Sequence, residues 1–369
     1  VPNGAPAPNT KDFSGTFTYL ESIEKPLKNA KKVILAVDND APGRKLAEEL
    51  GRRIGREKCY TVDYPEGCKD VNDVLMKHGE VGLKKIMNNP LPIPVKGIFS
   101  VGSLRNEIEQ LYKTGLKSGL STGFDQLNMY YTVRSGEMTI VTGIPSHGKS
   151  TFMDNLMVNM YVKHEWKFGV FSPENLPLER HASRLLEIIT ELPFVSSFSE
   201  RMTKEDMSSA IDHLNDAVHF VMPDEGDISI DSILELARVL VFRDGINGLI
   251  IDPWNEIEHE RPKALSETEY ISMALSKIRR FARTNDVHVW VLAHPTKLRK
   301  EDDGSYPVPT PYDISGSANF RNKADNCFAI HRNFETNESS IHVQKIRFRE
   351  VGMIGSAKLS FNRESGTYS

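Results

Sequence analysis

The chain has 369 residues, of which 39% are hydrophobic and 26% are charged, a composition typical of a folded protein of two or three domains. Its formal net charge of -4 argues against a protein coated with nucleic acid but still permits a local cationic surface. Cys59, Cys68 and Cys327 form no Cys-x2-Cys pair, which argues against a zinc site or a disulfide framework.

No apolar run reaches the roughly 18 residues that a membrane helix requires. The first residues, VPNGAPAPNTKDFSG, are polar and rich in proline and do not resemble a secretory signal. We therefore expect an intracellular protein in a reducing compartment, without a membrane partner. The cytoplasm of a bacterium or a phage-infected cell and the mitochondrial matrix both remain open.

The first 90 residues alternate between strand and helix patterns. Strands are predicted at VILAV (33–37) and YTVDYP (60–65), and helices at residues 42–54 and 70–87, where apolar side chains recur on one side. This order predicts a small α/β domain.

A proline-rich stretch at 88–99 predicts a linker, and apolar residues at helical spacing over 101–113 predict a short amphipathic helix after it. We therefore divide the chain into an N-terminal domain, a linker and a larger domain. Their expected ranges are 1–90, 91–118 and 119–369.

The larger domain alternates between strands and helices. The predicted strands are 138–143, 167–172, 246–253, 287–294, 327–332, 341–348 and 355–362. The predicted helices lie near 149–163, 177–190, 203–216, 229–242 and 266–284. Ser266 and Glu269 have the spacing of a capping box at the start of the last helix. Strands that are apolar throughout and separated by helices predict an α/β fold with a mostly parallel sheet covered on both faces.

The segment VTGIPSHGKST (141–151) lies between a predicted strand and a predicted helix and has the spacing Gly-x4-Gly-Lys-Ser. In this context the pattern predicts a loop whose backbone N–H groups bind phosphates, with Lys149 reaching the β and γ oxygens and Ser150 binding Mg²⁺. ATP or another NTP, with Mg²⁺, is therefore the expected cofactor. The candidate nucleotide-binding residues of the loop are Gly143, Ser146, Gly148, Lys149, Ser150 and Thr151.

Three further polar residues follow predicted strands. Asp252 ends an apolar strand, where a carboxylate can orient Mg²⁺ or only cap a turn. Glu174 follows the strand after the phosphate-loop helix, where a general base would stand, although an early Glu also favours a helix start. His294 ends another strand and is either a γ-phosphate sensor or an ordinary loop residue.

The larger domain resembles the RecA-like P-loop NTPase motor of the DnaB-type replicative helicases, and within them the Twinkle-like proteins and phage primase–helicases. The resemblance runs from about residue 119 to 366, in the segments STGFDQLN, SGEMTIVTGIPSHGKST, FSPEN, LIIDPWNE, VLAHPTK, ISGSANFRNKADNCFAIHR and QKIRF. It implies that Glu174 is the catalytic base and that His294 is the phosphate sensor.

The resemblance also assigns residues near the end of the motor. It implies that Arg347 acts as an arginine finger in the neighbouring subunit's site and that Lys345 assists it. Strand alternation would place both cations on one face, which by itself also fits a solvated strand. Arg332 and Phe361 resemble the pair that holds the nucleobase, although Phe361 also fits a core position.

A long polar segment, 295–311, follows the sensor strand, and loops of that length are usually functional or disordered. By itself it is also typical of a solvated charged loop, but the resemblance places it in the central channel of a ring. The candidate DNA-binding residues here and just after it are Lys297, Arg299, Lys300, Ser315, Gly316 and Ser317.

The N-terminal domain resembles the second half of a TOPRIM domain in AVDNDAPGRK (36–45) and GCKDVNDVL (67–75). The resemblance implies that Asp38 and Asp40 form a divalent metal pair, although a polar turn explains the same residues. The acidic Glu motif that opens a TOPRIM domain and a zinc-binding Cys cluster are both missing from this sequence. We therefore expect a truncated domain, a vestigial metal pair and no primase activity.

The resemblance implies an NTP-driven DNA helicase that forms a hexameric or heptameric ring, moves 5′ to 3′ on single-stranded DNA and separates the strands of a fork. The implied partners are single-stranded and fork DNA, further copies of the chain, a DNA polymerase and a single-strand-binding protein. One alternative is a RecA-like assembly or strand-exchange ATPase. Another is a nucleic-acid-binding loader whose hydrolysis is not coupled to unwinding.

Overall fold

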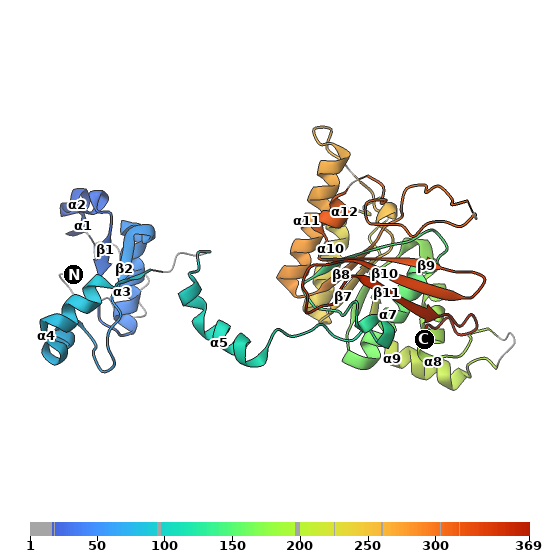
Figure 1. The fold of residues 1–369 in the computed structure, drawn as a ribbon, viewed down its shortest axis with the longest axis horizontal. Coiled ribbons are helices and arrows are strands. Elements are labelled where there is room, and N and C mark those ends of the chain that lie inside the picture. Colours follow the sequence, from blue (N-terminus) through green and yellow to red (C-terminus); the bar gives the residue numbers. More distant parts are fainter. Residues whose placement is uncertain are drawn as a thin grey trace. The chain divides into compact units, whose positions relative to one another are not determined.

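A computed structural model describes residue 17 and residues 19–93, 97–195, 200–224, 226–259, 261–302, 304–316 and 318–369. The chain forms two compact units, Val1–Gly115 and Leu116–Ser369, and each is described by itself (Figure 1). Among the described residues, no helix has the length and apolar character needed to cross a bilayer.

The first unit contains a three-stranded sheet in the order β1-β2-β3. Its strands are β1 (Val33–Leu35), β2 (Cys59–Thr61) and β3 (Leu91–Pro92). Its helices are α1 (Tyr19–Ser22), α2 (Glu24–Asn29), α3 (Ala41–Ile54) and α4 (Val71–Asn88), and a 3-10 turn η1 (Arg56–Lys58) precedes β2. The strands β1 and β2 are parallel, and β3 is antiparallel to β2.

The start of the predicted linker belongs to this sheet, which corrects the sequence interpretation. Residues 91 and 92 pair with β2, and the N–H of Ile93 donates to the carbonyl of Cys59 at 3.0 Å. Ile93 is buried against Leu46 and Leu50 of α3. Leu91 and Pro92 are exposed, and Ile93 is the buried residue that joins the small core.

The amphipathic helix predicted at 101–113 is present as a 3-10 turn η2 (Val101–Leu104) followed by α5 (Arg105–Thr114). No residue of α5 is buried. On its apolar side, Ile108 is 45% exposed and Leu111 is 46% exposed. This face therefore has no partner within the described part of the chain.

The second unit contains an eight-stranded sheet in the order β11-β10-β9-β4-β8-β7-β5-β6. Its strands are β4 (Met138–Thr142), β5 (Phe168–Phe171), β6 (Val218–Phe220), β7 (Gly248–Ile251), β8 (His288–Leu292), β9 (Asn326–Arg332), β10 (Glu338–Ile346) and β11 (Gly355–Ser360). The six strands from β9 to β6 are parallel, and β10 and β11 are antiparallel to their neighbours. The predicted α/β class with a mostly parallel sheet is confirmed.

Helices cover both faces of this sheet. They are α6 (Asp125–Asn128), α7 (Lys149–His164), α8 (Leu178–Thr190), α9 (Lys204–Asn215), α10 (Ile230–Arg243), α11 (Glu267–Asn285) and α12 (Asn319–Lys323). The capping box predicted at Ser266 and Glu269 opens α11. The short elements β6, α6 and α12 were not predicted, since three to five residues carry too little periodicity.

Alternate residues of the central strands pack into two separate hydrophobic cores, one on each face of the sheet. Val141, Val170 and Trp290 pack with α7, α8 and α9, whereas Ile140, Phe171 and Val289 pack with α10 and α11. Side chains of a strand point alternately to the two faces, so these central strands join both cores.

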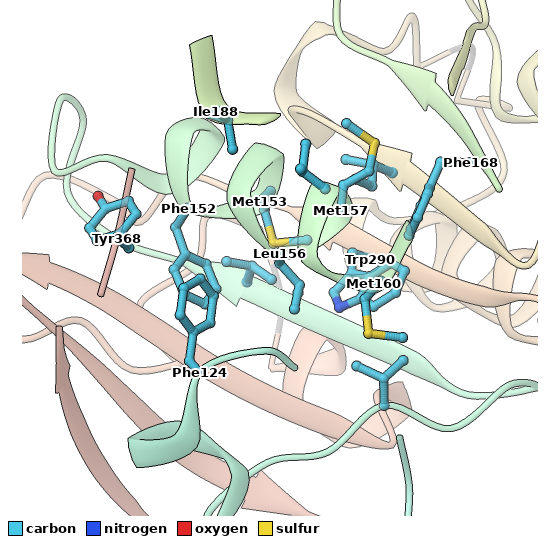
Figure 2. Close-up of a cluster of buried hydrophobic side chains, with 14 of the residues drawn as sticks. Phe124, Phe152, Met153, Leu156, Met157, Met160, Phe168, Ile188, Trp290 and Tyr368 are labelled. Atoms are coloured by element: carbon cyan, nitrogen blue, oxygen red, sulfur yellow. The ribbon is translucent and has the colours of Figure 1, made fainter. Parts of the chain in front are cut away.

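The helix α7 passes through the first of these cores (Figure 2). Phe152, Met153, Leu156 and Met157 are all at most 1% exposed. A helix that is apolar on most sides is stable only when buried, and this burial fixes its position. The N-terminus of α7 is therefore held rigidly at the carboxyl end of β4, where the candidate site lies.

Candidate nucleotide-binding site

The loop between β4 and α7 approaches the rest of the site closely at both of its glycines. A Cβ atom on Gly143 would lie 2.5 Å from the carbonyl oxygen of Ile330. Gly148 has a φ of 88°, and a Cβ there would lie 2.6 Å from the hydroxyl of Tyr368. Both positions therefore require glycine. The backbone N–H groups of the loop lie at the N-terminus of α7, an arrangement suited to binding phosphate.

Lys149 is buried at the base of this loop. Its Nζ donates to the carbonyls of Gly143 (2.9 Å) and Ile144 (3.3 Å). Burial lowers the pKa of Lys149 to about 8, while the nearby Asp252 and Glu174 oppose that change. The ammonium group thus lies among oxygen acceptors in a place with little water, where a bound anion would interact with it strongly.

Asp252 and Ser150 meet beside the loop. Asp252 directly follows β7, its N–H donates to the carbonyl of Phe171, and its carboxylate is hydrogen-bonded to Ser150. Burial raises the pKa of Asp252 to about 6, and the Ser150 hydrogen bond opposes this. A hydroxyl and a carboxylate in contact are hard oxygen donors that fit Mg²⁺, which usually takes its other ligands from water and phosphate.

Glu174 and His294 face each other from adjoining strand ends. Glu174 lies in a 3-10 turn η3 (Pro173–Asn175) after β5, and His294 follows β8. Their Oε1 and Nε2 atoms are 3.6 Å apart. Burial and the positive charge of Lys149 lower the pKa of His294, so its ring is neutral near pH 7. The N–H of His294 donates to Asn255 Oδ1 at 3.0 Å, which fixes the backbone there.

A polar network that the sequence interpretation missed supports the Glu174 turn. Arg184 of α8 donates to Asp154 Oδ2 of α7 at 2.7 Å and to the Oδ1 of Asn175 at 3.1 Å. His181 contacts the other oxygen of Asp154 at 2.9 Å. Arg184 therefore links the phosphate-loop helix to the residue next to Glu174. An Asp flanked by apolar residues and one Asn in the run FMDNLM was the sequence signal for this network.

Arg332 and Phe361 come together beside the loop. The guanidinium of Arg332 lies 4.2 Å from the centre of the Phe361 ring, and that ring packs on Tyr368 at 4.8 Å. The N–H of Arg332 donates to His147 Nδ1 at 3.1 Å. His147, within the loop, was not singled out from the sequence. A flat cation and an aromatic ring beside a phosphate loop have the chemistry to hold a nucleobase.

Lys345 and Arg347 lie at the other end of β4, away from the phosphate loop. Arg347 Nη1 is 3.2 Å from Asp325 Oδ1, and Asp325 pairs by backbone with Met138 at the start of β4. The strand β4 has five residues, so its first and last residues are four steps apart, or about 13 Å at roughly 3.3 Å per step. Arg347 is therefore out of reach of its own subunit's loop.

The expected strand alternation of these two cations is only partly right. The β10 register shifts between Val343 and Lys345, and β10 ends at Ile346, so Arg347 lies beyond the strand. Lys345 Nζ donates to the carbonyls of Arg321 (2.6 Å) and Ala324 (2.7 Å). The two side chains still reach one place, around the end of α12 and Asp325.

The candidate DNA-binding residues that the structure describes lie in the connection between β8 and α12. Lys297, Arg299 and Lys300 are exposed, and Lys300 lies 5.1 Å from the Tyr306 ring centre. A Pro295–Ile314 bridge joins the two ends of the loop. Hydrogen bonds from His331 and Gln344 to the carbonyls of Tyr306 and Pro309 attach the loop to β9 and β10.

The end of this loop packs on α11. Gly316 has a φ of 95°, and a Cβ there would lie 2.6 Å from Ile271. The Oγ1 of Thr268 donates to the carbonyl of Gly316 at 3.4 Å. Ser315 is exposed, and Ser317 lies outside the described residues. Gly316 is thus required by close packing at this point.

Asp38 and Asp40, in the first unit, have different surroundings. The Asp40 carboxylate accepts the N–H of Gly43 at 2.7 Å and caps α3. Asp38 lines a cavity together with Arg44 and Tyr64. The capping contact accounts for Asp40 without a metal ion.

Comparison with known proteins places this geometry in a family. The DnaB-like helicase C terminal domain matches residues 119–369, and a Toprim-like domain matches residues 12–75. A Twinkle homolog protein, chloroplastic/mitochondrial, of Arabidopsis thaliana is 39% identical over 392 residues, covering 100% of this chain and 55% of the relative.

More distant relatives agree. The replicative DNA helicase DnaB of Buchnera aphidicola is 25% identical over 253 residues, covering 66% of this chain and 54% of the relative. The chain thus spans about half the length of these relatives. A solved DnaB-like replicative helicase superposes with a TM-score of 0.61 at 18% identity, over 97% of this chain and 80% of that one, which shows a shared fold. The chain belongs to the family of DnaB-like helicases.

Proposed function

We propose that the chain is the motor part of a replicative DNA helicase that hydrolyses ATP or another NTP with Mg²⁺. The observation that carries the proposal is the division of the site between the two ends of β4. Lys149, Asp252 and Glu174 gather at one end, and Arg347 lies at the other end of this strand, which is about 13 Å long. A nucleotide on the loop then needs Arg347 from another subunit.

Each residue has a role that follows from its place. Lys149 binds the β and γ phosphate oxygens, and Ser150 and Asp252 hold the metal ion. Mg²⁺ would supply neutralising charge to the phosphates. Glu174 takes a proton from the attacking water, and His294, in contact with Glu174, responds to the γ-phosphate. Arg332 and Phe361 hold the base.

Arg347 of a neighbouring subunit stabilises the charge that develops on the transferred phosphoryl group. This dependence requires a head-to-tail assembly, and we propose a ring of six or seven subunits. The exposed apolar face of α5 supports the same assembly, since an amphipathic helix is suited to an apolar groove on the next subunit.

Lys297, Arg299, Lys300, Ser315 and Gly316 would contact DNA from a loop that begins directly after His294. Contacts to phosphates without base reading suit a motor that passes any sequence. We propose movement 5′ to 3′ on single-stranded DNA, unwinding of fork DNA, and a DNA polymerase and a single-strand-binding protein as further partners. The candidate metal pair Asp38 and Asp40 is given no role in this function.

The test is steady-state NTP hydrolysis with and without a long single-stranded DNA, followed by unwinding of a fork with a 5′ tail. We expect strong stimulation by DNA and strand separation that needs the 5′ tail. Turnover that is indifferent to DNA would favour a RecA-like assembly ATPase. DNA-independent oligomers with slow turnover would favour a loader.

A further inference from the structure

The buried carboxylate of Asp325 contacts the guanidinium of Arg347. The residue is 1% exposed, yet it lies outside the nucleotide site. Its Oδ1 contacts Arg347 Nη1 at 3.2 Å and Arg279 Nη2 at 2.5 Å. Its Oδ2 accepts the Met138 N–H at 3.1 Å and the Nε of Arg279 at 3.3 Å.

These contacts differ in how easily they can be broken. Arg279 binds both carboxylate oxygens from within α11, and its side chain is only 16% exposed. Arg347 makes one longer contact to an oxygen that Arg279 already shares, and its side chain is 42% exposed. Arg347 can therefore leave while Asp325 keeps Arg279 and the Met138 N–H, so no buried carboxylate is left unpaired.

Asp325 is also connected to β4, which ends in the phosphate loop, and to α12, which follows the candidate DNA-binding segment. Its N–H donates to the Met138 carbonyl at 2.9 Å, so it pairs reciprocally with the first residue of β4, the strand that ends in the phosphate loop. It follows α12 by two residues, and α12 follows the segment of Ser315 and Gly316. A shift of Asp325 would therefore move Arg347, the base of β4 and α12 together.

We propose that Asp325, held by Arg279, is a positioning residue that sets Arg347 for the neighbouring subunit's nucleotide. This inference rests on the proposed role of Arg347 and adds a residue to it. Asp325 holds the guanidinium of Arg347 in a defined place at the surface. When a nucleotide binds to the neighbouring subunit, the guanidinium moves across the interface toward it. The carboxylate acts only through Arg347 and touches no nucleotide.

The test is a double-mutant cycle on DNA-stimulated hydrolysis with Asp325→Asn, Arg347→Ala and the combined variant. Asn keeps the size of the side chain and loses the charge that holds Arg347. We expect Asp325→Asn to lower kcat about ten- to a hundredfold with KM for NTP unchanged, since small misplacements cost this much. In the Arg347→Ala background the same change should lower kcat no further.

Equal losses in both backgrounds would overturn the inference, because Asp325 would then act through the fold. An Arg347→Ala variant with undiminished DNA-stimulated turnover would instead overturn the arginine-finger proposal, so the two failures are distinguishable.

A milder variant keeps the test decisive if Asp325→Asn does not fold. Arg279→Lys retains the positive charge beside Asp325 and loses the two-oxygen contact. We expect a smaller loss of kcat, unchanged KM and again no loss in the Arg347→Ala background. Arg280→Lys is the matched control, since Arg280 is the next residue of α11 and is exposed. Unchanged kcat in Arg279→Lys, equal to that of the control, would overturn the inference.

Discussion

The two ends of the central strand β4 carry opposite kinds of chemistry. At the carboxyl end, Lys149, Asp252 and Glu174 surround an open phosphate loop, and burial shifts the pKa of Lys149 and of Asp252 toward neutrality. At the amino end, Asp325 is sealed in the core and presents Arg347 to solvent. We propose that the carboxyl end binds the nucleotide and that the amino end supplies Arg347 to the site of a neighbouring subunit.

In the proposed function, this difference means that a single subunit is insufficient. The groups proposed to bind phosphate and metal lie together at one end of β4, so we expect the cation at the far end to serve a different subunit. The polar networks on the two ends also differ in purpose. The Arg184 network supports the residue next to Glu174, whereas the Arg279 network holds Asp325, which contacts Arg347, the residue that we propose acts in a neighbouring subunit.

The largest effect is expected at the carboxyl end. Lys149→Ala removes the ammonium that faces the β and γ phosphates, and turnover should fall to background. Nucleotide binding should weaken as well, since a buried positive charge is lost. Steady-state hydrolysis and nucleotide titration measure both. Lys163→Ala, at the exposed far end of α7, is the control and should behave as the unaltered chain.

The amino end should show a different pattern. Arg347→Ala should retain nucleotide affinity and lose DNA-stimulated hydrolysis by about a thousandfold or more, the usual contribution of an arginine finger. Arg349→Ala, two residues on and exposed, should have little effect. A loss of nucleotide binding in Arg347→Ala would contradict the contrast between the two ends.

The supporting network at the carboxyl end should give a smaller effect. Arg184→Met removes the link between Asp154 and Asn175, so Glu174 is less well placed. We expect kcat to fall about tenfold with KM unchanged, and partial recovery in Arg184→Lys. Stopped-flow hydrolysis measures this, with Arg180→Met on the exposed side of α8 as control. An effect on KM alone would mean that Arg184 supports binding instead.

A pH effect on stability should arise at the amino end. His288, buried at the start of β8, donates from Nδ1 to the Arg134 carbonyl at 2.6 Å and is hydrogen-bonded through Nε2 to the Thr139 hydroxyl. Burial lowers the pKa of His288 from 6.5 to about 4. The folded protein then binds fewer protons than the unfolded chain between these values, so stability falls as the pH drops below 6.5. The loss at pH 4 should be about 3 kcal/mol.

Chemical denaturation at a series of pH values measures this loss. The variant His288→Gln should have a flatter profile between pH 4 and 6.5 than the unaltered chain. Identical slopes in the two proteins would show that other groups cause the acid sensitivity.

The fold and the strand ends could be predicted from the sequence because local patterns encode them. The apolar strands, their spacing by helices and the phosphate-loop pattern all lie within short windows. Arg184, His147 and Asp325 depend on contacts between segments far apart in the chain, and no periodicity marks such contacts. The register shift in β10 before Lys345 could not be predicted for a related reason, since the pairing with the partner strand determines a bulge.

The most direct test mixes two inactive variants. Lys149→Ala subunits keep Arg347, and Arg347→Ala subunits keep the phosphate loop, so an interface between them in one orientation holds a complete site. We predict that each variant alone is inactive in DNA-stimulated hydrolysis and that co-assembled rings regain activity, to about a quarter of the unaltered level if each interface works independently. A mixture no more active than its two components would contradict the claim that the site is completed by the neighbouring subunit.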